Sequence, residues 1–231
     1  MKTLGLIGGM SWESTLVYYQ LLNRMTRERL GGTHSAPLIL WSVDFAPIAV
    51  MQAEGRWDDA TAILVAAAQR LEQAGAEGLL ICANTMHRMA DEVQAAVSIP
   101  LIHVADATAA AIRAAGVQRP LLLATRYTME QDFYCDRLAA AGVHATIPGE
   151  ADRNRLQSII FDELIQGRFE PASKAAMLAM IDHARQGQGT DGVILGCTEF
   201  GLLIRAEDLD LPVFDTAVIH AEAAIAFALA G

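Results

Sequence analysis

Two cysteines of this 231-residue chain lie where an apolar run of strand length ends. Cys82 follows Leu79-Leu80-Ile81, and Cys197 follows Val193-Ile194-Leu195-Gly196. In parallel α/β sheets, ligands bind beyond the carboxyl ends of the strands, so we expect both thiols to point into such a crevice. For either residue taken alone, a buried structural cysteine stays open as the alternative, because free cysteine is among the most buried residue types.

Two such thiols could form a disulfide, contribute to a metal site, or act as an acid and a base on opposite sides of a substrate. Zinc needs about four ligands, or three and a water. His87 and His103 form no clustered pattern with the cysteines, so we expect no metal and no cofactor. The acid and base pair fits the symmetry best, since a thiolate can take a proton from one face of a carbon while a thiol gives one to the other. Two similar half-sites suit a reaction whose substrate and product are mirror images.

Alternating apolar runs and helical patterns predict parallel sheets with right-handed crossovers. The fold class we expect is α/β, with two pseudo-equivalent parallel-sheet domains and the active site in the cleft between them. The domains would comprise residues 1–104 plus 212–231, and residues 105–211. The expected strands are 3–8, 38–45, 79–82, 101–104, 121–124, 145–147, 193–197 and 213–214, and the expected helices are 12–30, 58–74, 86–97, 106–115, 129–141, 152–166, 172–186 and 217–229.

A short internal echo supports the two halves. Pro100-Leu101-Ile102-His103 and Pro212-Val213-Phe214-Asp215 both precede alanine-rich helices. Aligning Gly78 with Gly192 leaves the two cysteines one position out of step, so the repeat rests on the order of the elements more than on identity.

Two strand-to-helix turns offer further site residues. The first strand ends in Gly8-Gly9-Met10, and Ser11 is placed to cap the helix that follows. A helix N-terminus presents backbone N–H groups to an anion such as a carboxylate, which makes Met10 and Ser11 candidate site residues. Thr125-Arg126-Tyr127-Thr128 repeats this logic, so Thr125 and Thr128 are candidates too. Neither turn matches a dinucleotide-binding glycine pattern.

The composition excludes several classes of function. The net charge is −10 and no dense Lys/Arg cluster occurs, which argues against nucleic acid as a partner. No apolar stretch approaches the ~20 residues needed to span a bilayer, so we expect no membrane association. The cysteine count is odd, which fits reduced thiols and a cytoplasmic protein. We expect Cys135 to be a structural cysteine, and His103 and His220 to be packing groups.

The chain resembles the aspartate/glutamate racemase family along its whole length. Three motifs carry the resemblance: Gly8-Gly9-Met10-Ser11-Trp12-Glu13-Ser14-Thr15, Cys82-Ala83-Asn84-Thr85-Met86-His87 and Gly196-Cys197-Thr198-Glu199. The opening motif and the C-T-E ending resemble the aspartate-racemase branch, and within it a bacterial broad-specificity amino-acid racemase. The resemblance implies a homodimer of two α/β domains that needs no cofactor, with an amino acid as its small-molecule partner.

The resemblance also assigns roles to residues. It implies that Cys82 and Cys197 are the two bases, and that Asn84, Thr85 and Thr198 bind or orient the substrate carboxylate. Glu199 could cap a helix or tune the Cys197 thiol.

The chain departs from the family pattern in its basic residues. Members that act on aspartate hold the distal carboxylate with an arginine after the second strand and a lysine before the second cysteine. Here the first region offers Gln52, expected in a loop, and the second offers Arg168; Arg56 is a further basic residue. We therefore expect broad specificity for neutral polar amino acids. The alternatives are an aspartate racemase, a sister isomerase of the hydantoin-racemase type, and a non-catalytic amino-acid-binding homologue.

Overall fold

The computed structural model describes residues 1–230, and contacts divide this part of the chain into two compact units. Unit 1 comprises Met1–His103 together with the C-terminal segment from His220 onward, and unit 2 comprises Val104–Ile219. The chain therefore passes from one unit to the other twice. The second passage lies inside a single helix, α11 (Thr216–Leu229).

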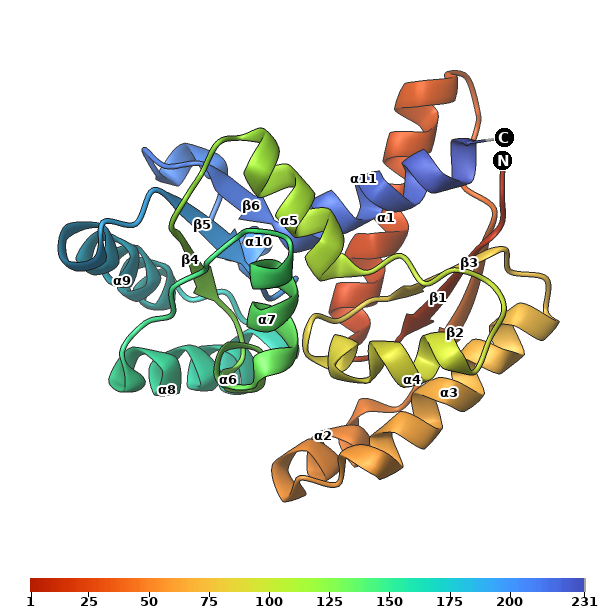
Figure 1. The fold of residues 1–231 in the computed structure, drawn as a ribbon, viewed down its shortest axis with the longest axis horizontal. Helices are drawn as coiled ribbons and strands as arrows, with labels where there is room; N and C mark the ends of the chain where they lie inside the picture. Colours follow the sequence, from red (N-terminus) through yellow and green to blue (C-terminus); the bar gives the residue numbers. More distant parts are fainter. Residues whose placement is uncertain (231) are drawn as a thin grey trace. The chain divides into compact units, whose positions relative to one another are not determined.

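Unit 1 is built on a parallel three-stranded sheet of order β2-β1-β3 (Figure 1). Its strands are β1 (Leu4–Gly8), β2 (Leu38–Ser42) and β3 (Gly78–Ile81). Its helices are α1 (Trp12–Leu30), α2 (Phe45–Glu54), α3 (Trp57–Gln73), the 3₁₀ helix η1 (Thr85–Met89) and α4 (Ala90–Ala95).

Helices cover both faces of this sheet. A Cβ atom added at Gly5 would meet Leu71 of α3, whereas one added at Gly78 would meet the ring of Phe227 on α11. A Cβ atom at Gly8, on the same face as Gly78, would meet Thr15 of α1. The sheet therefore lies between α3 on one face and α1 with α11 on the other. The two chain ends lie side by side (Figure 1), and the backbone N–H of Lys2 donates to the carbonyl of Ala228 over 2.8 Å.

Unit 2 is built on a second parallel three-stranded sheet, of order β4-β5-β6. Its strands are β4 (Pro120–Leu123), β5 (Gly192–Leu195) and β6 (Val213–Asp215). Its α-helices are α5 (Val104–Ala114), α6 (Arg126–Glu130), α7 (Asp132–Ala140), α8 (Glu150–Ser158), α9 (Pro171–Gln188) and α10 (Phe200–Leu203). Shorter helical turns are η2 (Ile159–Glu163), η3 (Leu164–Gln166) and η4 (Ala206–Asp208).

The two sheets share one pairing pattern, which extends the echo in the sequence. Gly78 pairs with Leu4 as Gly192 pairs with Pro120. Beyond β3, Leu79 pairs with Leu101, and beyond β5, Val193 pairs with Val213. Counted along the chain, the strand segments of each unit thus lie in the spatial order second, first, third, fourth. In unit 1 this order is β2, β1, β3 and Leu101, and in unit 2 it is Thr146, β4, β5 and β6. Parallel-sheet α/β architecture, expected from the sequence, is confirmed for both units.

Several expected elements differ in the structure. Residues 45–54 form α2 instead of a loop, because Asp44 caps this helix by accepting a hydrogen bond from Ala46 N at 3.2 Å. The expected strands 101–104 and 145–147 each pair at one residue, Leu101 or Thr146. The expected helix 129–141 begins earlier, at Arg126, and an extended Gln131 splits it into α6 and α7.

Candidate functional site

Cys82 is the first residue after β3 and is fully buried. Its backbone N–H donates to Ile7 O at 2.9 Å, which continues the ladder between β3 and β1 by one bond. Its carbonyl accepts a hydrogen bond from Ser14 Oγ at 2.8 Å, and Ser14 lies in the first turn of α1. Burial raises the pKa of the Cys82 thiol, so the resting group is a neutral thiol.

The turn between β1 and α1 lies directly beside this cysteine. Ser11 caps α1 as expected, with its side chain accepting from Ser14 N at 3.3 Å. Thr15 Oγ1 accepts from Gly9 N at 2.8 Å and donates to Ser11 O at 3.0 Å. Gly9 has a φ of +93°, and a side chain there would collide with the backbone of Val43. The expected contact residue Met10 is buried and packs into the core that α3 forms with the sheet.

The segment after Cys82 brings further predicted residues together. Asn84 and Thr85 are buried and lead into η1. Gln52 is buried on α2, and its amide Nε2 lies 3.0 Å from the thioether sulfur of Met86. The sequence separates Gln52 from the cysteine segment, yet the structure places its amide against the residue that follows Thr85.

Cys197 lies two residues after β5, with only 8% of its surface exposed. Its thiol donates to Glu199 Oε2 over 3.1 Å, and the hydroxyl of Thr198 donates to the same oxygen over 2.7 Å. Burial raises the pKa of the Cys197 thiol well above its usual value, and the negative charge of Glu199 raises it further. Glu199 therefore contacts the thiol itself, and Thr198 is oriented by Glu199.

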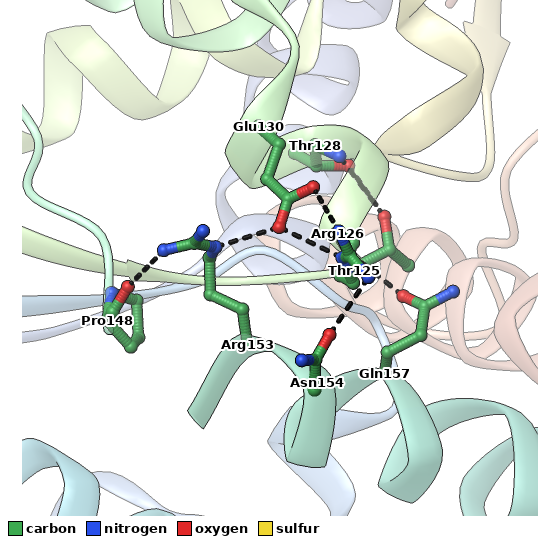
Figure 2. A network of polar contacts seen from close by, with 8 residues as sticks. All are labelled: Thr125, Arg126, Thr128, Glu130, Pro148, Arg153, Asn154 and Gln157. Atoms are coloured by element: carbon green, nitrogen blue, oxygen red, sulfur yellow. Dashed lines mark hydrogen bonds and ion pairs between the residues drawn. The ribbon is translucent and has the colours of Figure 1, made fainter. Parts of the chain in front are cut away.

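The turn after β4 carries Thr125 and Thr128. Thr125 caps α6, and its hydroxyl lies 3.1 Å from that of Thr128. Figure 2 shows how this turn is fixed to α8: Arg126 N donates to Gln157 Oε1 at 2.9 Å, and the Arg126 guanidinium donates to Asn154 Oδ1 at 2.9 Å.

Glu130 completes this network (Figure 2). It accepts from Arg126 Nε at 2.9 Å and from Arg153 Nε at 2.8 Å, and Arg126 holds the pKa of its carboxyl below the usual value. A hollow of about 300 Å³ beside the turn is lined by Arg126, Tyr127, Glu130, Gln131 and Gln157. The predicted pair Thr125 and Thr128 thus lies on a rigidly held turn.

Each unit therefore presents one buried thiol just beyond the carboxyl end of a strand, β3 or β5. The neighbouring strand, β1 or β4, leads into a helix that is capped by a hydroxyl residue, Ser11 or Thr125. A protein-family profile described as Asp/Glu/Hydantoin racemase matches residues 7–224. The chain belongs to this family.

Solved structures agree with the assignment to the racemase family. A structure described as a candidate Asp/Glu racemase from Yersinia pestis is 48% identical, with a TM-score of 0.91 over 99% of this chain and 100% of that one. An aspartate racemase homologue from Pyrococcus horikoshii is 38% identical, with a TM-score of 0.86 over 99% of each chain. Glutamate racemase from Francisella tularensis, solved with D-glutamate, is 14% identical and shares the fold with a TM-score of 0.68, covering 98% of this chain and 80% of that one.

The basic residues weighed for this racemase-family chain are occupied locally. Arg56 donates to Glu54 Oε2 at 2.7 Å and to Asp59 Oδ2 at 2.8 Å, at the start of α3. Arg168 donates to the backbone carbonyl of Asp162, six residues earlier. Both side chains are therefore engaged with residues close to them in the sequence.

Cys135, the third cysteine, lies outside the two cysteine segments. Cys135 lies on α7, half-buried, and burial raises the pKa of its thiol. Cys82, Cys135 and Cys197 are all free thiols. Within residues 1–230, no group of three or more His, Cys, Asp or Glu side chains is arranged to hold a metal ion, and no helix is long and apolar enough to cross a membrane.

Two residues that act on the cysteine segments, Ser14 and Asp215, were not singled out from the sequence. Ser14 binds the Cys82 carbonyl, although it was visible only as one letter of the opening motif. Asp215 ends β6, and burial raises the pKa of its carboxyl although Ala217 N and Val218 N donate to it. Its negative charge adds to the raised pKa of Cys197. The echo between residues 100–103 and 212–215 was the signal that could have marked Asp215.

Proposed function

We propose that this chain is an amino-acid racemase that needs no cofactor, with Cys82 and Cys197 as its two bases. One observation carries the proposal: two sheets of the same pairing pattern each place a buried free thiol just beyond the third strand. A structural cysteine in a core does not need to recur at the same edge of both sheets. Members of the racemase family are isomerases, which makes this chemistry the natural reading of the pair.

The proposed reaction is a proton exchange at the α-carbon of an amino acid. One cysteine, as thiolate, takes the α-proton from one face of the carbon, and the other, as thiol, gives a proton to the opposite face. The carbanion that forms between the two steps receives the second proton, so atoms and charge balance. After one turnover the protonation states of the two cysteines are exchanged, and the reverse reaction starts from the other enantiomer.

Both thiols must lose a proton to act as bases, and burial opposes this in the free protein. A substrate carries an α-ammonium group, and a positive charge beside a thiol favours the thiolate. We therefore propose that the substrate itself activates the bases when it binds. In unit 2, Glu199 accepts a hydrogen bond from the Cys197 thiol, and its negative charge opposes the thiolate until a substrate ammonium group offsets that charge.

For the substrate carboxylate we propose Asn84, Thr85 and Thr198, with the turns at Met10 and Ser11 and at Thr125 and Thr128 close to the site. Asn84 and Thr85 directly follow Cys82, and Thr198 directly follows Cys197, so each lies within the same short segment as a base. All three are buried, which makes a charged hydrogen bond to them stronger than it would be in water.

For the substrate side chain we propose neutral polar groups. Burying a carboxylate without a cationic partner is heavily penalised. Arg56 and Arg168 are held by local partners, while the Gln52 amide lies against the cysteine segment of unit 1. The side-chain amide of Gln52 can both donate and accept hydrogen bonds, which suits a hydroxyl such as that of homoserine.

We also propose that two copies associate through α1 and β2. One side of α1 exposes the apolar residues Trp12, Leu16 and Tyr19, and β2 exposes Leu40. Among the residues that the structure describes, β2 pairs with β1 alone and forms an edge of the sheet (Figure 1). These residues border a hollow of about 220 Å³. An exposed apolar patch beside an open strand edge is typical of an interface. Sedimentation equilibrium tests whether two copies associate.

The proposed reaction requires reduced thiols. We therefore propose the cytoplasm as the compartment of this protein.

The test is a screen of single L- and D-amino acids in deuterated water, read by chiral chromatography and by mass. A racemase yields the opposite enantiomer with deuterium at Cα. Activity that survives chelator treatment is expected, since the proposed chemistry uses only the two thiols. Binding without any exchange would instead support an amino-acid-binding protein, and turnover of hydantoins alone would support the sister isomerase.

A further inference from the structure

The carbonyl groups of three consecutive residues, Cys82, Ala83 and Asn84, each accept a hydrogen bond from a different donor. Ser14 Oγ donates to Cys82 O at 2.8 Å, His87 Nδ1 donates to Ala83 O at 2.9 Å, and His87 N donates to Asn84 O at 3.0 Å. Two of the three donors belong to His87. His87 therefore contributes two of the bonds that hold the chain through the cysteine segment.

The ring of His87 is in turn packed against two other rings of unit 1, those of His103 and His220. Its centroid lies 4.6 Å from that of His103 and 5.5 Å from that of His220, both in edge-on arrangements. His220 comes from α11 and meets Tyr18 of α1, whose hydroxyl lies 2.8 Å from His220 Nδ1. All four side chains are buried, so the cluster is a fixed part of the core of unit 1.

The hydrogen bonds define the state of two of these rings. His220 Nε2 lies 2.7 Å from Ile102 O, and a carbonyl only accepts, so this nitrogen carries the proton. His220 Nδ1 is then the acceptor for the Tyr18 hydroxyl. In the same way, His87 carries a proton on Nδ1, because Ala83 O can only accept. These bonds are consistent with a single tautomer for His87 and a single tautomer for His220.

Unit 2 carries no histidine at the corresponding position. Counting from the paired glycines Gly78 and Gly192, the position of His87 is occupied in unit 2 by Gly201, where an added Cβ would collide with Asp215. Cys197 is held by Glu199 instead. The histidine is therefore a feature of the Cys82 half-site and not of the shared fold.

From this asymmetry we infer that His87 is a positioning residue for Cys82, and that Tyr18 and His220 hold its ring in place; as a statement about turnover, this rests on the proposed racemase function. His87 does not touch the thiol. It fixes the peptide groups on the carboxyl side of Cys82, which set the direction of the thiol and of Asn84 together. A misplacement of a reacting group by about 1 Å can cost ~10²-fold in rate. Proton transfer by Cys82 therefore depends on the peptide groups that His87 holds in place.

The first test compares two substitutions of His87. Asn carries its amide nitrogen at the same branch point as Nδ1 of His, so His87→Asn keeps the bond to Ala83 O, whereas His87→Leu removes it. We expect His87→Leu to lower kcat by about tenfold to a hundredfold with KM changed by less than ~3-fold, and His87→Asn to restore most of kcat. His34→Leu, an exposed histidine of unit 1, is the matched control. Tyr18→Phe should shift kcat in the same direction by a smaller factor.

A second measurement identifies the base through which His87 acts. With Cys197→Ser, exchange of the α-proton with deuterium depends on Cys82; with Cys82→Ser, it depends on Cys197. His87→Leu should slow the Cys82-dependent exchange by about tenfold more than the Cys197-dependent exchange. Equal effects on both would overturn the inference, because they would reveal a general loss of structure.

A third measurement does not depend on activity. In a chain carrying Cys135→Ser and Cys197→Ser, Cys82 is the sole thiol, and its alkylation can be followed by mass spectrometry. His87→Leu should raise the alkylation rate about tenfold by loosening the segment, while His87→Asn should leave it within ~3-fold of the parent. Unchanged alkylation in His87→Leu would overturn the inference. If no amino acid is racemised and alkylation still responds, the positioning role stands and the proposed function falls.

Discussion

The Cys197 thiol and the Glu199 carboxylate are joined by a hydrogen bond of 3.1 Å within unit 2. Cys82 differs, because burial alone raises the pKa of its thiol and no carboxylate contributes to that shift. The two half-sites thus share a fold and a thiol but not the group that controls its ionisation. This difference allows the two bases to be told apart by their dependence on pH.

Replacing Glu199 by Gln should move the ionisation of Cys197 to lower pH. The negative charge of Glu199 raises the pKa of this thiol, so removing the charge lowers that pKa and makes thiolate available at lower pH. In a Cys82→Ser background, the rise of Cys197-dependent deuterium exchange with pH should shift to lower pH. Glu207→Gln, an exposed carboxylate of unit 2, is the control. A shift to higher pH would contradict the assigned role of Glu199.

Replacing either base should abolish racemisation while the fold is retained. A positioned acid or base contributes ~10²–10⁴-fold to a rate, so Cys82→Ser and Cys197→Ser should each lose at least about 10²-fold in kcat/KM. Serine is similar in size to cysteine, which limits damage to packing. Cys135→Ser on α7 should keep full activity. Full turnover by either single variant, measured by chiral chromatography, would rule out the two-base scheme.

Much of the scaffold can be predicted because its signals are local. Ser11 caps α1 as its place before the helical pattern predicts, and the buried runs before Cys82 and Gly196 are strands. The helix over residues 45–54 was missed because most of its residues are apolar, so its sequence does not show separate apolar and polar faces. Its ends did carry signals, since Asp44 caps it and Gly55 ends it in a left-handed conformation.

The surroundings of the candidate bases are less predictable, because they come from distant segments. Ser14 of α1 binds the carbonyl of Cys82, 68 residues further along the chain, and His220 reaches Ile102 from the far end of the chain. No periodicity or spacing encodes such contacts. Glu199 is the exception, since its contact with Cys197 lies within one short segment and could be raised from the sequence.

His220 should make the folded state sensitive to acid. Burial lowers its pKa to about 4, and it is faced by Tyr18, His87 and the carbonyl of Ile102. The unfolded chain binds a proton near pH 6.5, so the contribution of His220 to stability is complete above that pH and is lost as the pH falls toward 4. The loss amounts to about 3 kcal/mol. His220→Gln should flatten this part of the curve of unfolding free energy against pH, measured with urea, and an equally steep decline would contradict the assignment.

Aspartate should be a poorer substrate than a neutral polar amino acid. The two basic residues weighed as partners of a distal carboxylate already have partners: Arg56 pairs with Glu54 and Asp59, and Arg168 donates to the Asp162 carbonyl. We expect kcat/KM for a neutral amino acid such as homoserine to exceed that for aspartate at least about tenfold, which corresponds to ~1.4 kcal/mol of transition-state binding. Gln52→Leu should reduce turnover of homoserine more than that of alanine, because it removes the amide. If aspartate proves the better substrate, one of the two arginines must leave its partner to bind the distal carboxylate. Arg56→Ala and Arg168→Ala will identify that arginine, because only its replacement should selectively remove aspartate turnover.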